Sequence, residues 1–208
     1  MRATLTASVT CALLLALGAA LRAAEPKVLL EENFASELSE DWFWGLGTWT
    51  AGNGVLRGFE SGPRRHGPVK MRRLEFTDGV VECEFRLERG ATFAGIIFNG
   101  NQERGHIVHL VMARDQLRIL AHPKKGENIE LLNQPHALEA DAWHRVKITF
   151  TGPKMTAQVD ETTVAAEHAC IAETKQTFGL GGDSGGPEGE TAGALEFRKL
   201  KIGELPKN

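Results

Sequence analysis

Residues 79–113 constrain the fold more than any other part of the sequence. Apolar and charged side chains alternate strictly through the first part of this stretch. The apolar positions are Val81, Cys83, Phe85 and Leu87, and the charged positions are Glu82, Glu84, Arg86 and Glu88. A period of two gives a β-strand one apolar and one charged face, whereas a helix would scatter the charges around its circumference. Apolar segments at residues 92–99 and 106–113 follow after short turns, so we expect three consecutive strands.

Many other short strands are expected along the chain, each bounded by turn residues. They are predicted at residues 28–34, 69–76, 116–121, 129–132, 144–151, 155–159, 162–166, 177–181 and 194–202. The sequence Gly52-Asn53-Gly54 is typical of a tight hairpin turn. No capped segment with a helical period is present. The pattern predicts an all-β fold, a two-sheet antiparallel β-sandwich or jelly roll.

The first 24 residues resemble a secretory signal peptide. Arg2 precedes the apolar run CALLLALGAAL, and small residues continue through Ala24. The run is shorter than the roughly 20 apolar residues that span a bilayer. We therefore expect a signal peptide at residues 1–24, a single domain at residues 25–208, and a secreted or periplasmic protein without a membrane span.

The net charge argues against some partners. It is −3 for the whole chain and becomes −5 without residues 1–24, which contain two arginines. A mildly acidic domain gives no electrostatic reason to expect nucleic acid or an anionic membrane as partner. Cys83 and Cys170 remain in the domain. Export permits a disulfide between them, but the apolar position of Cys83 favours two buried free thiols.

Two local patterns resemble the concanavalin A-like superfamily. Trp143-His144-Arg145-Val146, followed by Val159-Asp160, is similar to a "W-H-x-V … V-D-G" hairpin of laminin G and related lectin-like domains, with Glu161 in place of the glycine. The order of Asp41-Trp42, a G-x-W hairpin, the charged strand, Gly95-Ile-x-Phe98 and residues 105–110 resembles the secreted 3-keto-disaccharide hydrolase family. In that family Asn-Ser precedes the Gly-Ile-x-Phe strand and Arg follows it. Phe93, Ala94 and Asn99 stand at these positions here.

The resemblance implies a concanavalin A-like sandwich that recognises carbohydrate on one sheet face. Four polar residues are expected to share that face, Glu84, Arg86, Asn99 and His109. Trp42, Trp49 and Trp143 match core positions of the resemblance, so Trp44 is the expected stacking residue. Two simpler interpretations stay open: His109 as a structural histidine, and Trp44 packed inward at the sheet edge.

Glu82 and Glu84 are candidate catalytic carboxylates, with His109 as a third acid–base candidate. Residues at i and i+2 of a strand project from one face at about 6.5–7 Å, close to the roughly 5–5.5 Å between the carboxyl groups of a retaining glycosidase. Arg86 stands beside these glutamates. A solvated ladder of ion pairs is therefore the favoured interpretation.

The segment Gly182-Asp183-Ser184-Gly185-Gly186-Pro187 matches the nucleophile motif of trypsin-like serine proteases. We do not expect a protease, because His168 precedes Ser184 by only 16 residues and a triad needs a particular geometry. A glycine turn is favoured, with a structural calcium at Asp183, Glu188 and Glu190 as a minor alternative.

No other cofactor is expected. No glycine-rich phosphate loop opens a helix, which argues against a nucleotide. No histidine pair has zinc spacing, because His106 and His109 should lie on opposite faces of a strand.

The leading functional hypothesis is a secreted β-sandwich that binds a glycan or glycoside. A glycoside-cleaving enzyme of the 3-keto-disaccharide hydrolase type is the first alternative. A structural or protein-interaction domain without a small ligand is the second. The oligomeric state stays open.

Overall fold

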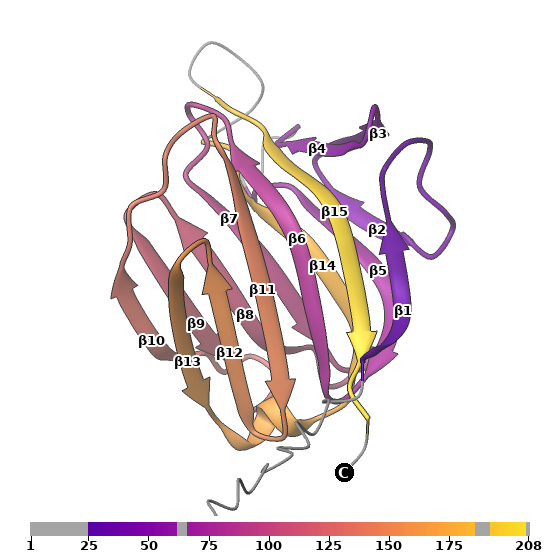
Figure 1. The fold of residues 1–208 in the computed structure, drawn as a ribbon, viewed down its shortest axis with the longest axis vertical. Coiled ribbons are helices and arrows are strands. Elements are labelled where there is room, and N and C mark those ends of the chain that lie inside the picture. The colour runs from indigo at the N-terminus through magenta and orange to yellow at the C-terminus, as the bar shows by residue number, and fades with distance from the viewer. Residues whose placement is uncertain (1–24, 62–65, 186–191, 207–208) are drawn as a thin grey trace, which may run out of the picture.

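Two antiparallel β-sheets lie face to face in the computed structural model, which describes residues 25–61, 66–185 and 192–206 (Figure 1). The eight-strand sheet has the order β13-β12-β11-β6-β15-β4-β3, and β1 pairs with β15 beside this path. In chain order its strands are β1 (Lys27–Glu32), β3 (Thr48–Gly52), β4 (Val55–Phe59), β6 (Gly79–Leu87), β11 (Trp143–Thr151), β12 (Lys154–Val159), β13 (Thr162–Glu167) and β15 (Leu195–Glu204).

The seven-strand sheet has the order β10-β9-β8-β7-β14-β5-β2 and lies behind the first in Figure 1. Its strands are β2 (Trp44–Leu46), β5 (Val69–Phe76), β7 (Phe93–Asn99), β8 (His106–Ala113), β9 (Gln116–Ala121), β10 (Ile129–Pro135) and β14 (Lys175–Asp183). One helical turn, η1 (Ala169–Ala172), is present in the described part of the chain. The predicted all-β, two-sheet antiparallel sandwich is confirmed.

The core fills the space between the two sheets. The apolar positions of β6 point into it, and Val81, Phe85 and Leu87 have no exposed surface. Phe98 of the opposite sheet packs edge-on against Phe150, with ring centroids 4.8 Å apart. Burying each large apolar side chain stabilises the fold by about 1.5–3 kcal/mol. The alternation read from the sequence is therefore what positions both sheets.

The W-H-x-V … V-D pattern forms a hydrogen-bonded hairpin. His144 Nδ1 lies 2.7 Å from Asp160 Oδ2, and the backbone N–H of Arg145 donates to Asp160 Oδ1 at 2.9 Å. Asp160 has a φ of 50°, a left-handed conformation that aspartate tolerates better than most residues. Asp160 thus takes the positive φ, and Glu161 can follow it without the usual glycine.

The strand order corrects one expectation about the site. β6 and β7 are consecutive in the chain but lie in opposite sheets, because β6 pairs with β11 and β15. Glu84 and Arg86 therefore belong to the eight-strand sheet, and Asn99 and His109 to the seven-strand sheet. The prediction that these four residues share one face is wrong.

A β-bulge in β8 corrects a second expectation. His106 pairs with Asn99 while Val108 pairs with Phe98, so Ile107 is an extra residue. Ile107 and Val108 are both fully buried, and the outward position resumes at His109. The inserted residue brings His106 and His109 to the same outer face, and the prediction of opposite faces is wrong.

Three other expectations concern the chain as a whole. Cys83 and Cys170 are free and buried, as the sequence favoured. Within the described ranges, no helix is long and apolar enough to cross a membrane. The predicted signal peptide at residues 1–24 lies outside the described residues and stays a prediction.

Candidate functional site

The strand register shows which side chains share the outer face of the seven-strand sheet. Trp44 pairs with Met71, Met71 with Gly179, Gly179 with Ile97, and Ile97 with His109. Directly paired residues of neighbouring strands project to the same side. One row of side chains therefore crosses this face from Trp44, which is 47 % exposed, to His109.

A second row lies beside the first and contains two glycines. Leu46 pairs with Val69, Val69 with Gly181, Gly181 with Gly95, and Gly95 with Val111. Gly181 is crowded by Val69, whereas a Cβ at Gly95 would meet only ordinary van der Waals contacts. The central strands therefore carry few side chains here, and the sheet surface is hollowed at Gly95.

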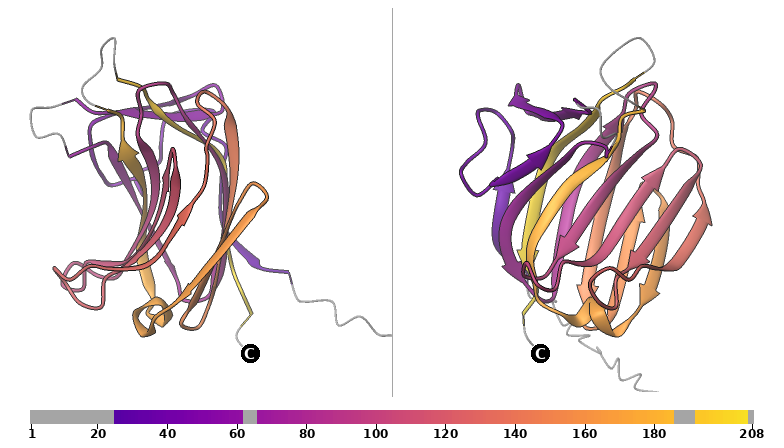
Figure 2. Two further views of the ribbon diagram at one scale, coloured as in Figure 1. Left: turned by 90° about the vertical axis from the view of Figure 1, so that its left-hand side faces the viewer. Right: turned by 180° about the vertical axis from the view of Figure 1, so that it is seen from behind.

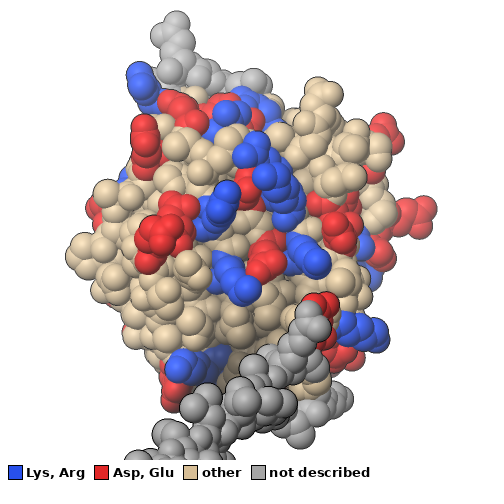
Figure 3. Space-filling view, in the orientation of Figure 1, with Lys and Arg blue, Asp and Glu red and all other residues tan. Residues whose placement is uncertain are grey.

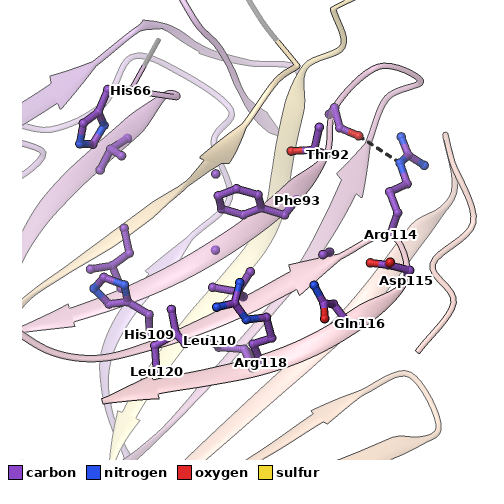
Figure 4. Close-up of a pocket in the computed structure, with 17 residues that line it drawn as sticks. His66, Thr92, Phe93, His109, Leu110, Arg114, Asp115, Gln116, Arg118 and Leu120 are labelled. Carbon is purple, nitrogen blue, oxygen red and sulfur yellow. Dashed lines mark hydrogen bonds between the residues drawn. The ribbon is translucent and has the colours of Figure 1, made fainter. Parts of the chain in front are cut away.

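A pocket of about 660 Å³ lies at this hollow, and we call it the glycine pocket (Figure 4). Phe93 projects from the start of β7, and Gln116 and Arg118 project from β9. His109 and His66 line the side that faces β5 and its preceding loop. The pocket thus combines an aromatic ring, imidazoles, a primary amide and a guanidinium over an open backbone floor. In Figure 2 the left view shows the sheets edge-on, and the right view shows the seven-strand sheet facing the reader.

Arg114 holds the loop that leads into this pocket. Its Nε donates to Ala91 O at 3.0 Å, and its Nη2 donates to Glu88 O at 2.7 Å and to Leu87 O at 3.3 Å. Hydrogen bonds from a charged donor are stronger than those between neutral groups. Arg114 therefore ties the β8–β9 turn to the crossover between the two sheets and fixes the position of Phe93.

Three histidines form a cluster at the far side of the glycine pocket. The ring centroid of His109 lies 4.6 Å from that of His106 and 4.6 Å from that of His122, and the centroids of His106 and His122 are 5.3 Å apart. His106 Nδ1 lies 2.7 Å from Asn99 Oδ1, and His122 Nδ1 donates to Glu127 O at 3.0 Å. Because a carbonyl oxygen only accepts, this contact fixes the proton of His122 on Nδ1.

Burial keeps this histidine cluster neutral. The pKa of His109 is lowered to about 3, first by burial and then by the neighbouring His106 and His122. Burial also lowers the pKa values of His106 and His122. His109 Nε2 and His122 Nε2 are buried without a hydrogen-bond partner. Among the residues that the structure describes, no group of three His, Cys, Asp or Glu side chains is arranged to hold a metal ion.

The outer face of the eight-strand sheet is a ladder of ion pairs (Figure 3). Glu82 pairs with Lys147 at 2.7 Å, and Glu84 pairs with Arg198 at 2.5 Å and Lys199 at 2.9 Å. Burial alone would raise the pKa of Glu84, but hydrogen bonds from Lys199 and Arg198 outweigh it and hold that pKa below its usual value. These contacts favour the ladder over an acid–base role for Glu82 and Glu84.

Arg86 belongs to the same ladder, where it pairs with Glu196 and packs against Trp143. The guanidinium groups of Arg86 and Arg198 lie 5.0 Å and 3.9 Å from the centroid of the Trp143 ring. The prediction that Trp143 is a core residue is therefore wrong. The inward position of β11 is taken by the next residue, His144, which is buried.

The protease-like motif does not form a catalytic site. His168 precedes η1, and Ser184 follows β14, so a nine-residue strand separates them by about 30 Å. Ser184 is buried and accepts a hydrogen bond from the backbone N–H of Glu60 at 3.0 Å. His168 accepts from the backbone N–H of Cys170 and caps η1.

Asp183, the calcium candidate, has protein partners. Its carboxylate accepts hydrogen bonds from Thr92 Oγ1 and from the backbone N–H of Gly185, each at 2.8 Å. Its two expected co-ligands, Glu188 and Glu190, lie outside the described residues. The structural calcium therefore stays a prediction.

Comparison with known families identifies the domain type. The laminin G domain family matches residues 85–194, which include β11, β12 and β13 and five of the seven strands of the seven-strand sheet. The chain belongs to the laminin G domain family. No curated protein matches the sequence. The 3-keto-disaccharide hydrolase family is not confirmed.

Solved structures share the sandwich of this laminin G domain at low sequence identity. The carbohydrate binding module CBM66 from Bacillus subtilis is 13 % identical, with a TM-score of 0.60 over 76 % of this chain and 91 % of that one. LamAcat from Zobellia galactanivorans is 10 % identical, with a TM-score of 0.61 over 85 % and 97 %. The VIP36 exoplasmic/lumenal domain, in a Ca²⁺/Man3GlcNAc-bound form, is 10 % identical, with a TM-score of 0.60 over 86 % and 91 %. These similarities show the fold.

The sequence interpretation found part of the outer face of this laminin G domain and missed its centre. Trp44, Asn99 and His109 do lie on one sheet, in the same row or the next. Gly95 and Arg118 were not expected to contribute. Their signal is the pairing register of β14, β7, β8 and β9, which a single strand does not reveal.

Proposed function

We propose that this domain binds carbohydrate in the glycine pocket, on the outer face of the seven-strand sheet. The observation that carries the proposal is the open backbone floor at Gly95 between Phe93 and the polar tips of Gln116 and Arg118. A sugar ring has an apolar face and a rim of hydroxyl groups. An aromatic side chain suits the former, and amide and guanidinium groups suit the latter.

The shape and charge of the pocket support a small, largely uncharged ligand. Its volume of about 660 Å³ falls in the range of pockets that bury small molecules. Arg118 is offset by Glu130, whose carboxylate lies 2.6 Å from Nε. His109 is neutral at pH 7 because burial lowers its pKa to about 3. Two structural neighbours, a carbohydrate binding module and a domain in a Man3GlcNAc-bound form, agree with such a ligand.

Binding without cleavage is the form of this function that the ion pairs favour. Glu82 and Glu84 lie on the other sheet, away from the glycine pocket, and Glu84 is held ionised by Arg198 and Lys199. A carboxylate in this state cannot donate the proton that glycoside cleavage requires. The predicted signal peptide would deliver the domain outside the cytoplasm, where glycans are exposed.

Filling the pocket tests the proposal. Gly95→Val places methyl groups over the pocket floor without backbone strain, because Gly95 has no positive φ and its Cβ would be uncrowded. Gly52→Val is the matched control. Gly52 is the last residue of strand β3, and a Cβ added there would meet nothing within 4 Å. The wild-type protein and both variants would be applied to a glycan array, and hits would be measured by calorimetry and assayed for released sugar.

We expect binding of at least one neutral glycan class by the wild type and by Gly52→Val, and loss of roughly tenfold or more in affinity for Gly95→Val. Equal binding by all three proteins would move the site elsewhere. No binding to any glycan would contradict the function itself, and released sugar would replace binding by hydrolysis.

A further inference from the structure

A second hollow lies on the same outer face, beyond the histidine cluster. It has a volume of about 900 Å³, and we call it the amide pocket. Its lining includes Phe43, Asn101, Gln102, Gln176, Thr177 and His106. Asn99 also lines it and lies in β7, six residues after Phe93 of the glycine pocket. At roughly 3.3 Å per residue, the two pockets extend over about 20 Å of one strand.

The register places the two pockets side by side. Arg73 pairs with Thr177, Thr177 with Asn99, and Asn99 with His106. This row is the next on the outer face after the row that contains His109. Because the bulge at Ile107 turns His106 outward, the two histidine rings meet with centroids 4.6 Å apart and form the border between the pockets.

Hydrogen bonds hold the side chains of the border in place. Asn99 Oδ1 lies 2.7 Å from His106 Nδ1, and Asn99 Nδ2 donates to Thr177 Oγ1 at 3.1 Å. Both ends of the Asn99 amide are therefore occupied within the protein. A ligand that crosses the border meets a fixed surface rather than side chains that must first be ordered, which lowers the entropy cost of binding.

The amide pocket has the chemistry of a site for an uncharged, hydroxyl-rich ligand. The side chains of Asn101, Gln102 and Gln176 are exposed and offer planar donors and acceptors. Phe43 is 44 % exposed, and the Arg73 guanidinium lies 4.3 Å from its ring centroid. Arg73 and Glu75 contribute one charge of each sign, so the lining as a whole selects neither an anion nor a cation.

From this adjacency and this lining we infer that the domain binds a glycan chain rather than a single sugar, with a second subsite in the amide pocket. The inference rests on the proposed carbohydrate binding in the glycine pocket. The chain would run along β7 and β14, past His106 and His109, with its later sugars against Phe43 and Gln176. A single sugar would fill the glycine pocket alone.

The test measures affinity against chain length. Array-positive glycans would be prepared as a series from the single sugar to the hexasaccharide and titrated by calorimetry into the full chain without residues 1–24. The variant is the double substitution Phe43→Ala with Gln176→Ala. Val28→Ala is the control, because Val28 is an apolar residue of similar exposure, at 51 %, on β1 of the other sheet.

For the wild type and Val28→Ala, we expect affinity to rise roughly tenfold or more between the single sugar and the longer members. For the double variant, the longer glycans of the series should bind no more tightly than the short ones. The single sugar should bind the double variant and the wild type with the same affinity. Near-ultraviolet circular dichroism would verify that the variant is folded.

The failure of this inference is distinguishable from the failure of the function. If affinity does not rise with length, or if the double variant keeps the rise, the second subsite is wrong while carbohydrate binding stands. If the double variant weakens the single sugar as much as the hexasaccharide, the amide pocket is not a separate subsite. If no member of any series binds, both proposals are overturned.

Discussion

At the scale of single residues, position on the sheet matters more than residue type. Trp44 matches no core position of the resemblance, and it is 47 % exposed at the sheet edge. Trp143 matches a core position of the resemblance but faces outward, with two arginines against its ring. A shift of one position along a strand is enough to turn a tryptophan from the core to the outer face, because alternate strand residues face opposite sides. Sequence alone therefore predicts well that a tryptophan lies in a strand. It predicts less well which face of the sheet the side chain is on.

Arg114 gives a prediction at this scale. Arg114→Met removes a charged donor from three backbone carbonyls, at Ala91, Glu88 and Leu87. The carbonyls of Leu87 and Glu88 keep their backbone donors, the N–H groups of Asp141 and Ala91, but all three lose the charge-assisted hydrogen bond. We expect a loss of about 2–4 kcal/mol in the free energy of unfolding, measured by urea denaturation. Glycan binding should weaken too, because the loop leads into Phe93.

Arg118→Met is the control for Arg114→Met. Arg118 makes one ion pair, with Glu130, and both side chains are more than a third exposed, at 34 % and 40 %. Such a pair contributes about 0–1 kcal/mol. Equal destabilisation by the two substitutions would show that the three carbonyl contacts of Arg114 do not hold the loop.

At the scale of elements, local pattern predicted the strands well and irregularities poorly. The strands at residues 69–76, 106–113 and 116–121 begin and end where alternation and turn residues place them. The short strand β2 was missed, because three residues carry too little pattern to recognise. The bulge at Ile107 was missed as well, since it is visible only when β8 is aligned with its partner β7.

The hairpin between β12 and β13 gives a prediction at the scale of elements. Asp160→Ala removes the acceptor for the Arg145 N–H and for His144 Nδ1, and it places a residue with a poor left-handed preference at a φ of 50°. We expect a loss of about 2–3 kcal/mol in the free energy of unfolding. Asp160→Asn should lose less than half of that, because asparagine tolerates the backbone and keeps one acceptor.

Urea denaturation of the wild type and the three variants would test the hairpin. Glu161→Ala, at the exposed neighbouring position, is the control and should change stability by no more than about 0.5 kcal/mol. If Asp160→Ala were no more destabilising than Glu161→Ala, the aspartate of the W-H-x-V … V-D pattern would have no structural role here.

At the scale of the whole molecule, the two outer faces differ in charge and in use. The eight-strand sheet exposes a ladder of ion pairs around Glu84, whereas the seven-strand sheet exposes glycines and amides beside a cluster of neutral histidines. The sequence predicted both sheets but could not assign strands to them. β6 pairs with β11 and β15, which lie far away in the chain, and such pairing is set by the packed core rather than by local pattern. The candidate site was consequently predicted as a mixture of two faces.

The histidine cluster predicts that the molecule is labile in acid. The folded pKa of His109 is about 3, well below the value of about 6.5 for an unfolded histidine. Between these two pH values the unfolded chain binds more protons than the folded one, so the free energy of unfolding falls as the pH falls. The lowered pKa values of His106 and His122 act in the same direction. Nearby Arg104, whose Nη2 donates to His122 O, opposes protonation of the cluster further.

Urea denaturation at a series of pH values from 7.5 to 4.5 would measure this loss. For the wild type we expect the free energy of unfolding to fall below pH 6.5 with a contribution from His109 of up to about 1.4 kcal/mol per pH unit. His109→Leu removes this titrating group, so the free energy of unfolding should fall less steeply with pH than in the wild type. His136→Gln, outside the cluster, should keep the wild-type slope. Equal slopes for the wild type and His109→Leu would mean that His109 takes up its proton in the folded protein, and that the border between the two pockets is less buried than its contacts indicate.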